Sequence, residues 1–139
     1  MRLSTLARTL AKTLMFGGLL ALAGAASAQK TQLLVYTALE TDQIKAYADG
    51  FNKVYPDIEI KWVRDSTGVI TAKLLAEKAN PQADAVMGVA ASSLALMDKQ
   101  GMLEPYAPLN LDAIMSQYRD KKKVPAWWGM DVWGATVCF

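Results

Sequence analysis

The stretch Gln32-Leu33-Leu34-Val35-Tyr36-Thr37-Ala38-Leu39-Glu40-Thr41 joins a short apolar run to the start of an amphipathic segment. Residues 32–36 are apolar and rich in β-forming side chains, which is typical of a buried strand. In the segment that follows, apolar side chains recur with the spacing of one helical face: Ile44, Tyr47, Ala48, Phe51 and Val54. The sequence therefore predicts a strand and then a helix that buries this face and ends at Pro56-Asp57.

The same alternation of strand and helix continues along the chain. We expect a strand over residues 58–63, a polar turn over 64–68, a helix over 69–79 with Ile70, Leu74 and Leu75 inward, a strand over 85–89 and a helix over 92–100. Gly101 fits the left-handed cap of the last helix. This order predicts the α/β class, with a mainly parallel sheet flanked by helices.

The remainder of the chain has a less regular pattern. We expect residues 101–106 to return to the sheet, residues 112–118 to form a short helix and residues 127–139 to form paired strands. Four side chains there are available for burial: Val132, Trp133, Val137 and Phe139. Because residues 135–139 have strand character and no terminator, the sequence predicts a fragment.

The first 28 residues have the pattern of a cleaved signal peptide. Residues 1–12 carry three cations and no acid, residues 14–22 are apolar, and Ala26-Ser27-Ala28 is a small-residue exit. The apolar part is about half of the ~20 residues that a membrane span needs. We therefore expect cleavage after Ala28, a mature domain over residues 29–139 and a periplasmic location.

Composition excludes several classes of function. Removing the three leader cations changes the formal charge of +2 to −1, and no basic stripe for nucleic acid remains. The chain has no histidine, and its one cysteine is Cys138, which excludes histidine-dependent triads and an internal disulfide. We expect no catalytic residue, no cofactor and no metal ligand, and we expect a monomer.

The loops after the three predicted strands are rich in small and hydroxyl-bearing side chains. In α/β sheets, ligands bind beyond the carboxyl ends of the strands, where helix starts offer free N–H groups to anions. The candidate ligand-binding residues in these loops are Thr37, Ala38, Ser66, Thr67, Gly68, Ala90 and Ala91. For each single loop, helix capping explains the serine and threonine residues equally well.

Two acidic residues lie in or beside the same loops. Glu40 follows the first strand, and Asp65 follows the second. Either carboxylate would suit a cationic group on a ligand. Each also suits the start of a helix, where acidic side chains are favoured by the helix dipole.

Several motifs resemble the ferric-ion-like group of type 2 periplasmic binding proteins. They are residues 34–40 (LVYTALE), 62–68 (WVRDSTG), 71–78 (TAKLLAEK), 80–86 (NPQADAV), 101–106 (GMLEPY) and 129–134 (GMDVWG). The branch they resemble most is that of 2-aminoethylphosphonate importer binding proteins. The resemblance implies two α/β lobes with the ligand between them, of which this chain supplies the N-terminal one.

The resemblance also implies a function. It predicts the periplasmic binding component of an ABC importer, a non-enzymatic receptor that captures a small phosphonate such as 2-aminoethylphosphonate and delivers it to a membrane permease. A ferric-ion or other oxyanion receptor of the same fold is the first alternative, because Glu40 could bind a hard cation. A periplasmic enzyme is the second alternative, and a ligand-reading domain of a sensor is the third.

Overall fold

A computed structural model gives the fold of the chain and describes residues 30–134. The predicted signal peptide, residues 1–28, and the predicted strand at residues 135–139 lie outside the described residues. Every helix and strand that the structure describes belongs to the unit that begins at Thr31. None of the helices within residues 30–134 has the length and apolar character that a membrane span requires.

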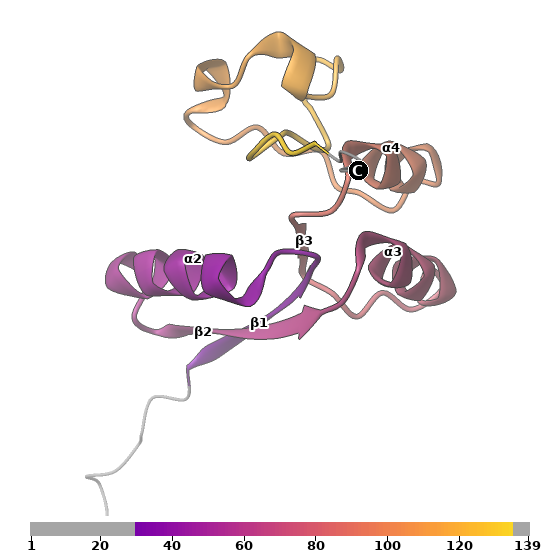
Figure 1. The fold of residues 1–139 in the computed structure, drawn as a ribbon. Helices are drawn as coiled ribbons and strands as arrows, with labels where there is room; N and C mark the ends of the chain where they lie inside the picture. Colours follow the sequence, from indigo (N-terminus) through magenta and orange to yellow (C-terminus); the bar gives the residue numbers. More distant parts are fainter. Residues whose placement is uncertain (1–29, 135–139) are drawn as a thin grey trace, which may run out of the picture. The chain divides into compact units, whose positions relative to one another are not determined.

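Strands and helices alternate through the first two thirds of the unit (Figure 1). In chain order they are β1 (Thr31–Thr37), α2 (Thr41–Val54), β2 (Ile58–Arg64), α3 (Thr67–Ala76), β3 (Ala85–Met87) and α4 (Ala91–Lys99). The strands form one parallel sheet in the order β2-β1-β3. The predicted α/β class, the parallel sheet and all six elements are confirmed, with boundaries that differ by up to three residues.

The core lies on one face of this sheet. In the parallel register Tyr36 pairs with both Val63 and Val86, so these three side chains share a face. They pack with buried residues of α3, α4 and the loop before α4: Ile70, Leu74, Val89 and Met97. The chain leaves β1 towards β2 and later crosses back to β3, so right-handed crossovers put α2 and α3 on opposite faces.

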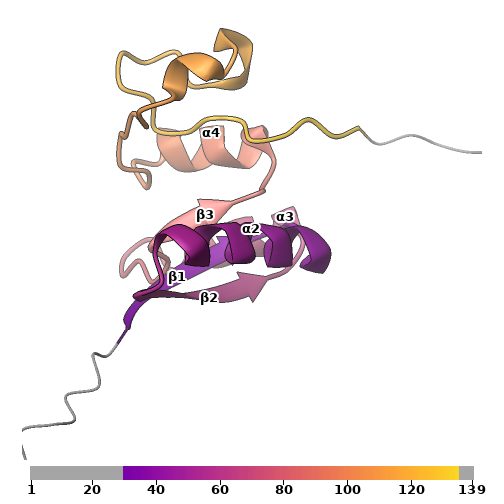
Figure 2. The same cartoon turned by 90° about the vertical axis from the view of Figure 1, so that its left-hand side faces the viewer.

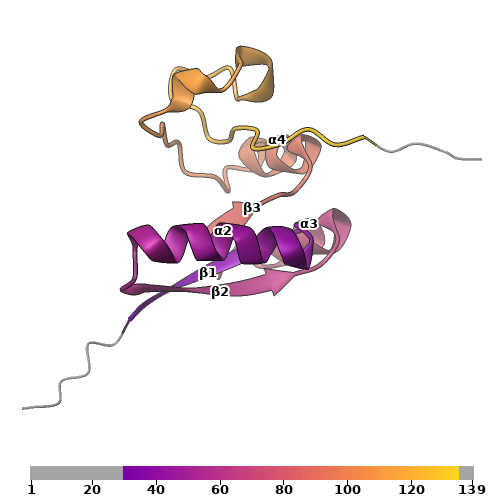
Figure 3. The same ribbon diagram turned by 60° about the vertical axis from the view of Figure 1, so that its left-hand side comes forward.

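Helix α2 is less buried than its amphipathic pattern predicts. None of its residues is buried, and Tyr47 and Val54 are 42% and 67% exposed. The prediction that Tyr47 and Val54 are buried is therefore wrong within the part of the chain that the structure describes. Figure 3 shows α2 running along β1 and β2, and β2 is the edge strand of the sheet. Because no described strand lies beyond β2, the outer part of the apolar face has nothing to pack against.

The predicted return of residues 101–106 to the sheet is also wrong. Met102 N–H donates to Met97 O at 3.0 Å, which closes the end of α4, and Gly101 has the predicted positive φ of 67°. The predicted helix at 112–118 is two 3-10 turns, Leu111–Ala113 and Ser116–Tyr118. The positive φ of Gly101 and the hydrogen bond from Met102 to Met97 explain why residues 101–106 do not return to the sheet.

The segment after α4 runs back beside that helix, as Figure 2 shows. Lys122 Nζ forms an ion pair with Asp98 of α4 at 2.5 Å, which attaches the lysine loop. Residues 127–134 form no strand; their one sheet-like contact is the isolated bridge from Trp128 to Arg119. Trp133 is 69% exposed. The predicted paired strands are therefore absent from the described part of that segment.

Gly88 connects β3 to α4 at a point where only glycine fits. Its φ is +67°, and a Cβ there would come within 2.3 Å of the Leu39 side chain. Gly101 has the same φ, but a Cβ there would meet nothing within 4 Å. Both glycines therefore have a positive φ that other residues rarely adopt. Only at Gly88 does a neighbouring side chain also occupy the space that a Cβ would need.

Replacing each glycine by alanine should separate these two effects. We expect Gly101→Ala to lower the free energy of unfolding by about 1 kcal/mol, the cost of a left-handed alanine. Gly88→Ala should cost about 1–3 kcal/mol more, because Leu39 must move. Urea unfolding of the complete, processed protein measures both values. Equal losses for the two variants would contradict the close packing of Gly88 on Leu39.

A polar cluster holds α3 against β1. The hydroxyl of the buried Tyr36 donates to Glu77 Oε2 at 3.0 Å, and Lys73 Nζ bonds Glu77 Oε1 at 2.5 Å. The hydrogen bond from Lys73 is the main cause that lowers the pKa of Glu77, and the bond from Tyr36 adds to it against partial desolvation. The bond to Glu77 in turn raises the pKa of Lys73.

This cluster predicts a pH dependence of stability. A lowered carboxyl pKa contributes stability above the unfolded-state pKa of Glu77, and that stability is lost as pH falls through the folded-state pKa. The raised pKa of Lys73 contributes stability that is present below pH ~10.4 and lost at higher pH. We expect Glu77→Gln to flatten the stability profile at both ends, measured as urea midpoints from pH 3 to 11. Glu104→Gln, at an exposed loop carboxylate, is the control and should leave the profile unchanged.

Candidate functional site

The carboxyl ends of the three strands bring three loops to one edge of the sheet. Two backbone hydrogen bonds tie these loops together: Ala38 N–H donates to Met87 O at 3.4 Å, and Asp65 N–H donates to Thr37 O at 3.1 Å. The loop after β1 therefore lies between the loops after β2 and β3. Each loop leads directly into a helix, so three helix starts are adjacent at this edge.

The loop after β1 is organised by Thr37. This residue has no exposed surface, and its Oγ1 accepts the N–H of Leu39 at 3.1 Å. Leu39 is itself buried against Gly88, whereas Ala38 is half-buried. Of the two candidate residues in this loop, Thr37 is buried and fixes the loop's conformation through its hydrogen bond to Leu39. Ala38 lies nearer the surface.

The start of α3 carries the hydroxyl residues that the sequence singles out. Ser66 Oγ accepts the N–H of Val69 at 3.4 Å, so the capping interpretation of Ser66 is confirmed. Thr67, the first residue of the helix, is half-buried, and its hydroxyl makes no hydrogen bond within residues 30–134. Gly68 presents open space where a side chain would be, so a ligand could approach the backbone closely.

The start of α4 has no side-chain cap. Ala90 is the N-cap residue, and its carbonyl accepts the N–H groups of Ser93 and Leu94 at 2.9 and 3.2 Å. Ala91, the first helical residue, is exposed. Small side chains at both positions leave the first N–H groups of α4 uncovered.

Backbone N–H groups are the chemical feature that the three helix starts share. Those without a hydrogen-bond partner in the described chain are the first two of each helix, at Thr41, Asp42, Thr67, Gly68, Ala91 and Ser92. Helix starts carry a partial positive charge of roughly half an elementary charge. This edge of the sheet is therefore suited to hold an anion with several acceptor oxygens.

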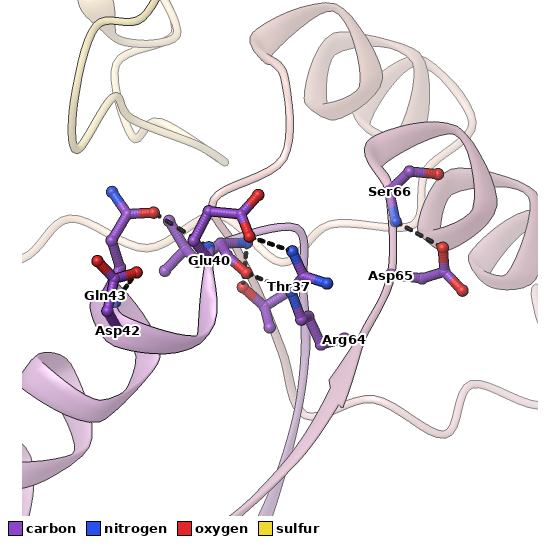
Figure 4. Close-up of polar contacts among 8 residues, drawn as sticks. Thr37, Glu40, Asp42, Gln43, Arg64, Asp65 and Ser66 are labelled. Carbon is purple, nitrogen blue, oxygen red and sulfur yellow. Dashed lines mark hydrogen bonds and ion pairs between the residues drawn. The ribbon is translucent and has the colours of Figure 1, made fainter.

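The two acidic candidates have different surroundings (Figure 4). Glu40 forms an ion pair with Arg64, whose Nε also donates to Leu39 O at 2.8 Å. Asp65 Oδ1 accepts the N–H of Ser66 at 2.7 Å. Arg64 was not among the candidates, because sequence pattern alone assigns it to a turn; the structure makes it the last residue of β2.

Carboxylates at this edge do not assemble into a metal site. Within residues 30–134 no three acidic or cysteine side chains gather at the spacing of metal ligands. The Glu40 oxygen that could bind a hard cation is already bonded to the Arg64 guanidinium.

A hollow lies beside the lysine loop. It has a volume of about 420 Å³ and is lined by Arg119, Asp120 and the three consecutive lysines 121–123. Two of its cations are already engaged: Arg119 donates to Leu111 O at 3.1 Å, and Lys122 pairs with Asp98 at 2.5 Å. The sheet edge, with its unpartnered N–H groups, is the better candidate site.

Comparison with known proteins gives one family and several relatives. A stretch of 62 residues is 40% identical to a probable ABC transporter periplasmic-binding protein (y4fP) of Sinorhizobium fredii, covering 45% of this chain and 17% of that protein. The structure of the periplasmic binding protein AfuA from Actinobacillus pleuropneumoniae, with fructose-6-phosphate bound, superposes with a TM-score of 0.61 at 32% identity. That match covers 70% of this chain and 30% of AfuA.

A more distant structure has the same fold. Iron-bound HitA from Pseudomonas aeruginosa matches with a TM-score of 0.60 at 19% identity, over 66% of this chain and 29% of HitA. The matched part is less than a third of each of these three proteins. The type 2 periplasmic binding protein fold is therefore confirmed for the part of the chain that they cover. Residues 37–136 match the model of one family, and the chain belongs to that family, the bacterial extracellular solute-binding proteins.

Proposed function

We propose that the chain is the N-terminal lobe of the periplasmic binding component of an ABC importer, and that its ligand is a small phosphonate such as 2-aminoethylphosphonate. The observation that carries the proposal is the group of unpartnered N–H groups at the starts of α2, α3 and α4. A phosphonate head presents three acceptor oxygens and a negative charge. Both properties match what helix starts bind.

The amino group of this ligand class also has suitable neighbours. Asp42 and Asp65 are exposed acids at the starts of α2 and α3, and neither forms an ion pair among the described residues. Each accepts one backbone N–H, which leaves further oxygen lone pairs free. A zwitterion that carries a phosphonate and an ammonium group would use both the N–H groups and these carboxylates.

The proposal includes a partner and a location. Members of the family are solute-binding proteins, and a binding component of an importer delivers its ligand to a permease in the inner membrane. We propose a periplasmic monomer released by cleavage after Ala28, with a second lobe that closes over the ligand. One lobe cannot exclude water from a small anion, so the complete protein is needed for tight binding.

Sugar phosphates are the second candidate ligands. AfuA, at 32% identity, was solved with fructose-6-phosphate bound. A phosphate ester presents the same tetrahedral, anionic group as a phosphonate. The two classes differ in what is attached to that group, a polyhydroxylated chain in one and a short amine in the other.

Calorimetry on the complete, processed protein tests the proposal. We expect binding of 2-aminoethylphosphonate with a Kd in the micromolar range or below. Methylphosphonate, which lacks the amine, should bind more weakly. Fructose 6-phosphate, inorganic phosphate and ferric citrate are the competing probes. Binding of ferric ion with no response to any phosphonate or phosphate would overturn the anion assignment.

Alanine variants at the start of α3 test whether the hydroxyl groups bind the ligand. We expect the double change Ser66→Ala and Thr67→Ala to weaken 2-aminoethylphosphonate binding by about 1–3 kcal/mol, the range for a hydrogen bond to a charged group. Loss of the Ser66 cap should also lower the free energy of unfolding by about 1 kcal/mol. Calorimetry and urea unfolding measure the two effects separately.

The matched control is Thr71→Ala, one turn further along α3. Its hydroxyl donates to Thr67 O at 2.6 Å within the helix, so its loss should change stability without changing affinity. If the double variant is less stable but binds as tightly as the unmodified protein, Ser66 and Thr67 serve the helix alone.

A further inference from the structure

Arg64 lies where the end of β2 meets the start of α2. In the sheet register it pairs with Thr37, the last residue of β1, so both side chains leave the sheet on the same face. Its Nε donates to Leu39 O at 2.8 Å, and its Nη2 bonds the Glu40 carboxylate. Figure 4 shows the guanidinium beside Glu40, next to the loop that precedes α2.

Glu40 puts a negative charge at the point where the proposed ligand needs positive potential. It is the N-cap residue of α2, one residue before the unpartnered N–H of Thr41. A carboxylate there repels an anion and competes with it for the first N–H groups of the helix. The side chain of Glu40 is 71% exposed, so water and salt screen part of its charge, and the Arg64 guanidinium offsets the part that remains.

The start of α2 has its own support besides this ion pair. Glu40 N–H donates to the side-chain oxygen of Gln43 at 3.1 Å, and the Glu40 side chain accepts the N–H of Gln43, so the two residues form a capping box in which a glutamine at position 40 would keep an acceptor oxygen. Ile44 N–H donates to Glu40 O at 2.9 Å. Because these bonds stabilise the first turn, a change of charge at Arg64 or Glu40 leaves it in place.

We propose that Arg64 is a positioning residue for anion capture, which acts by neutralising the carboxylate of Glu40 at the start of α2. This inference rests on the function proposed above and adds a residue that the strand-end loops alone did not identify. The neighbouring acids Asp42 and Asp65 form no ion pair with Arg64 among the described residues. Arg64 therefore acts on Glu40 in particular and leaves the other two carboxylates available.

A double-mutant cycle in the complete, processed protein tests this role. The variants are Arg64→Gln, Glu40→Gln and the two together, with methylphosphonate as the probe because it lacks an amine. We expect Arg64→Gln to weaken binding about tenfold, which corresponds to ~1.4 kcal/mol. Glu40→Gln should bind at least as tightly as the unmodified protein, because it leaves the guanidinium without its carboxylate partner. The double variant should recover to within about threefold of the unmodified protein, because no uncompensated carboxylate remains.

Two further measurements distinguish charge from structure. Arg64→Lys, which keeps the charge, should retain most of the affinity. The loss in Arg64→Gln should shrink between about 0.02 and 0.5 M salt, because screening weakens an exposed charge. A double variant as weak as Arg64→Gln would overturn the inference, as would full affinity in Arg64→Gln itself. Failure of the unmodified protein to bind any phosphonate or phosphate would instead count against the proposed function.

Discussion

Parallel pairing of β1 with strands on both sides is the constraint on which the rest of the structure depends. Parallel neighbours end at the same edge of a sheet, so all three strands release their chains at one place. Each strand is followed within four residues by a helix, and the loops are too short to carry the helix starts elsewhere. The hydrogen bonds from Ala38 to Met87 and from Asp65 to Thr37 then hold the loops in contact. The anion site that we propose at this edge therefore rests on backbone topology more than on any particular side chain.

Apart from the exposed Asp42 and Asp65, most side chains at this edge are small, buried or already bonded. Thr37 and Leu39 are buried beneath the first loop, and Gly88 passes so close to Leu39 that no side chain fits. Ala90 and Ala91 cover little of the backbone at the start of α4. Arg64 and Glu40 form an ion pair with each other. Besides the two exposed carboxylates, the uncovered groups include peptide N–H groups, which do not select strongly among phosphonates, phosphates and other oxyanions.

The sequence predicts what depends on local pattern and fails where distant parts of the chain decide. Strands, helices and the caps at Ser66 and Gly101 follow from periodicity and residue type, and the structure has them. The exposure of Tyr47 and Val54 could not be read from periodicity, because it depends on how many strands lie beneath α2. Residues 101–106 also look like a strand, and there the cause is local, because the bond from Met102 N–H to Met97 O at the end of α4 directs the chain away from the sheet. Arg64 was missed because its partner, Glu40, lies 24 positions earlier in the chain.

For the site that we propose, the balance of charge at the sheet edge is one argument for a zwitterionic ligand over a simple anion. Three carboxylates, Glu40, Asp42 and Asp65, stand against one guanidinium, which leaves a formal charge of −2. Three helix starts supply about +1.5 in partial charge. A dianion such as phosphate would thus meet no excess of positive charge from the described residues of this lobe. In our proposal Arg64 neutralises Glu40, the ligand's ammonium group offsets one of the two remaining negative charges, and the N–H groups bind the phosphonate. Under this proposal, Asp42 and Asp65, which oppose a bare anion, would be contacts for the amino group of an aminophosphonate.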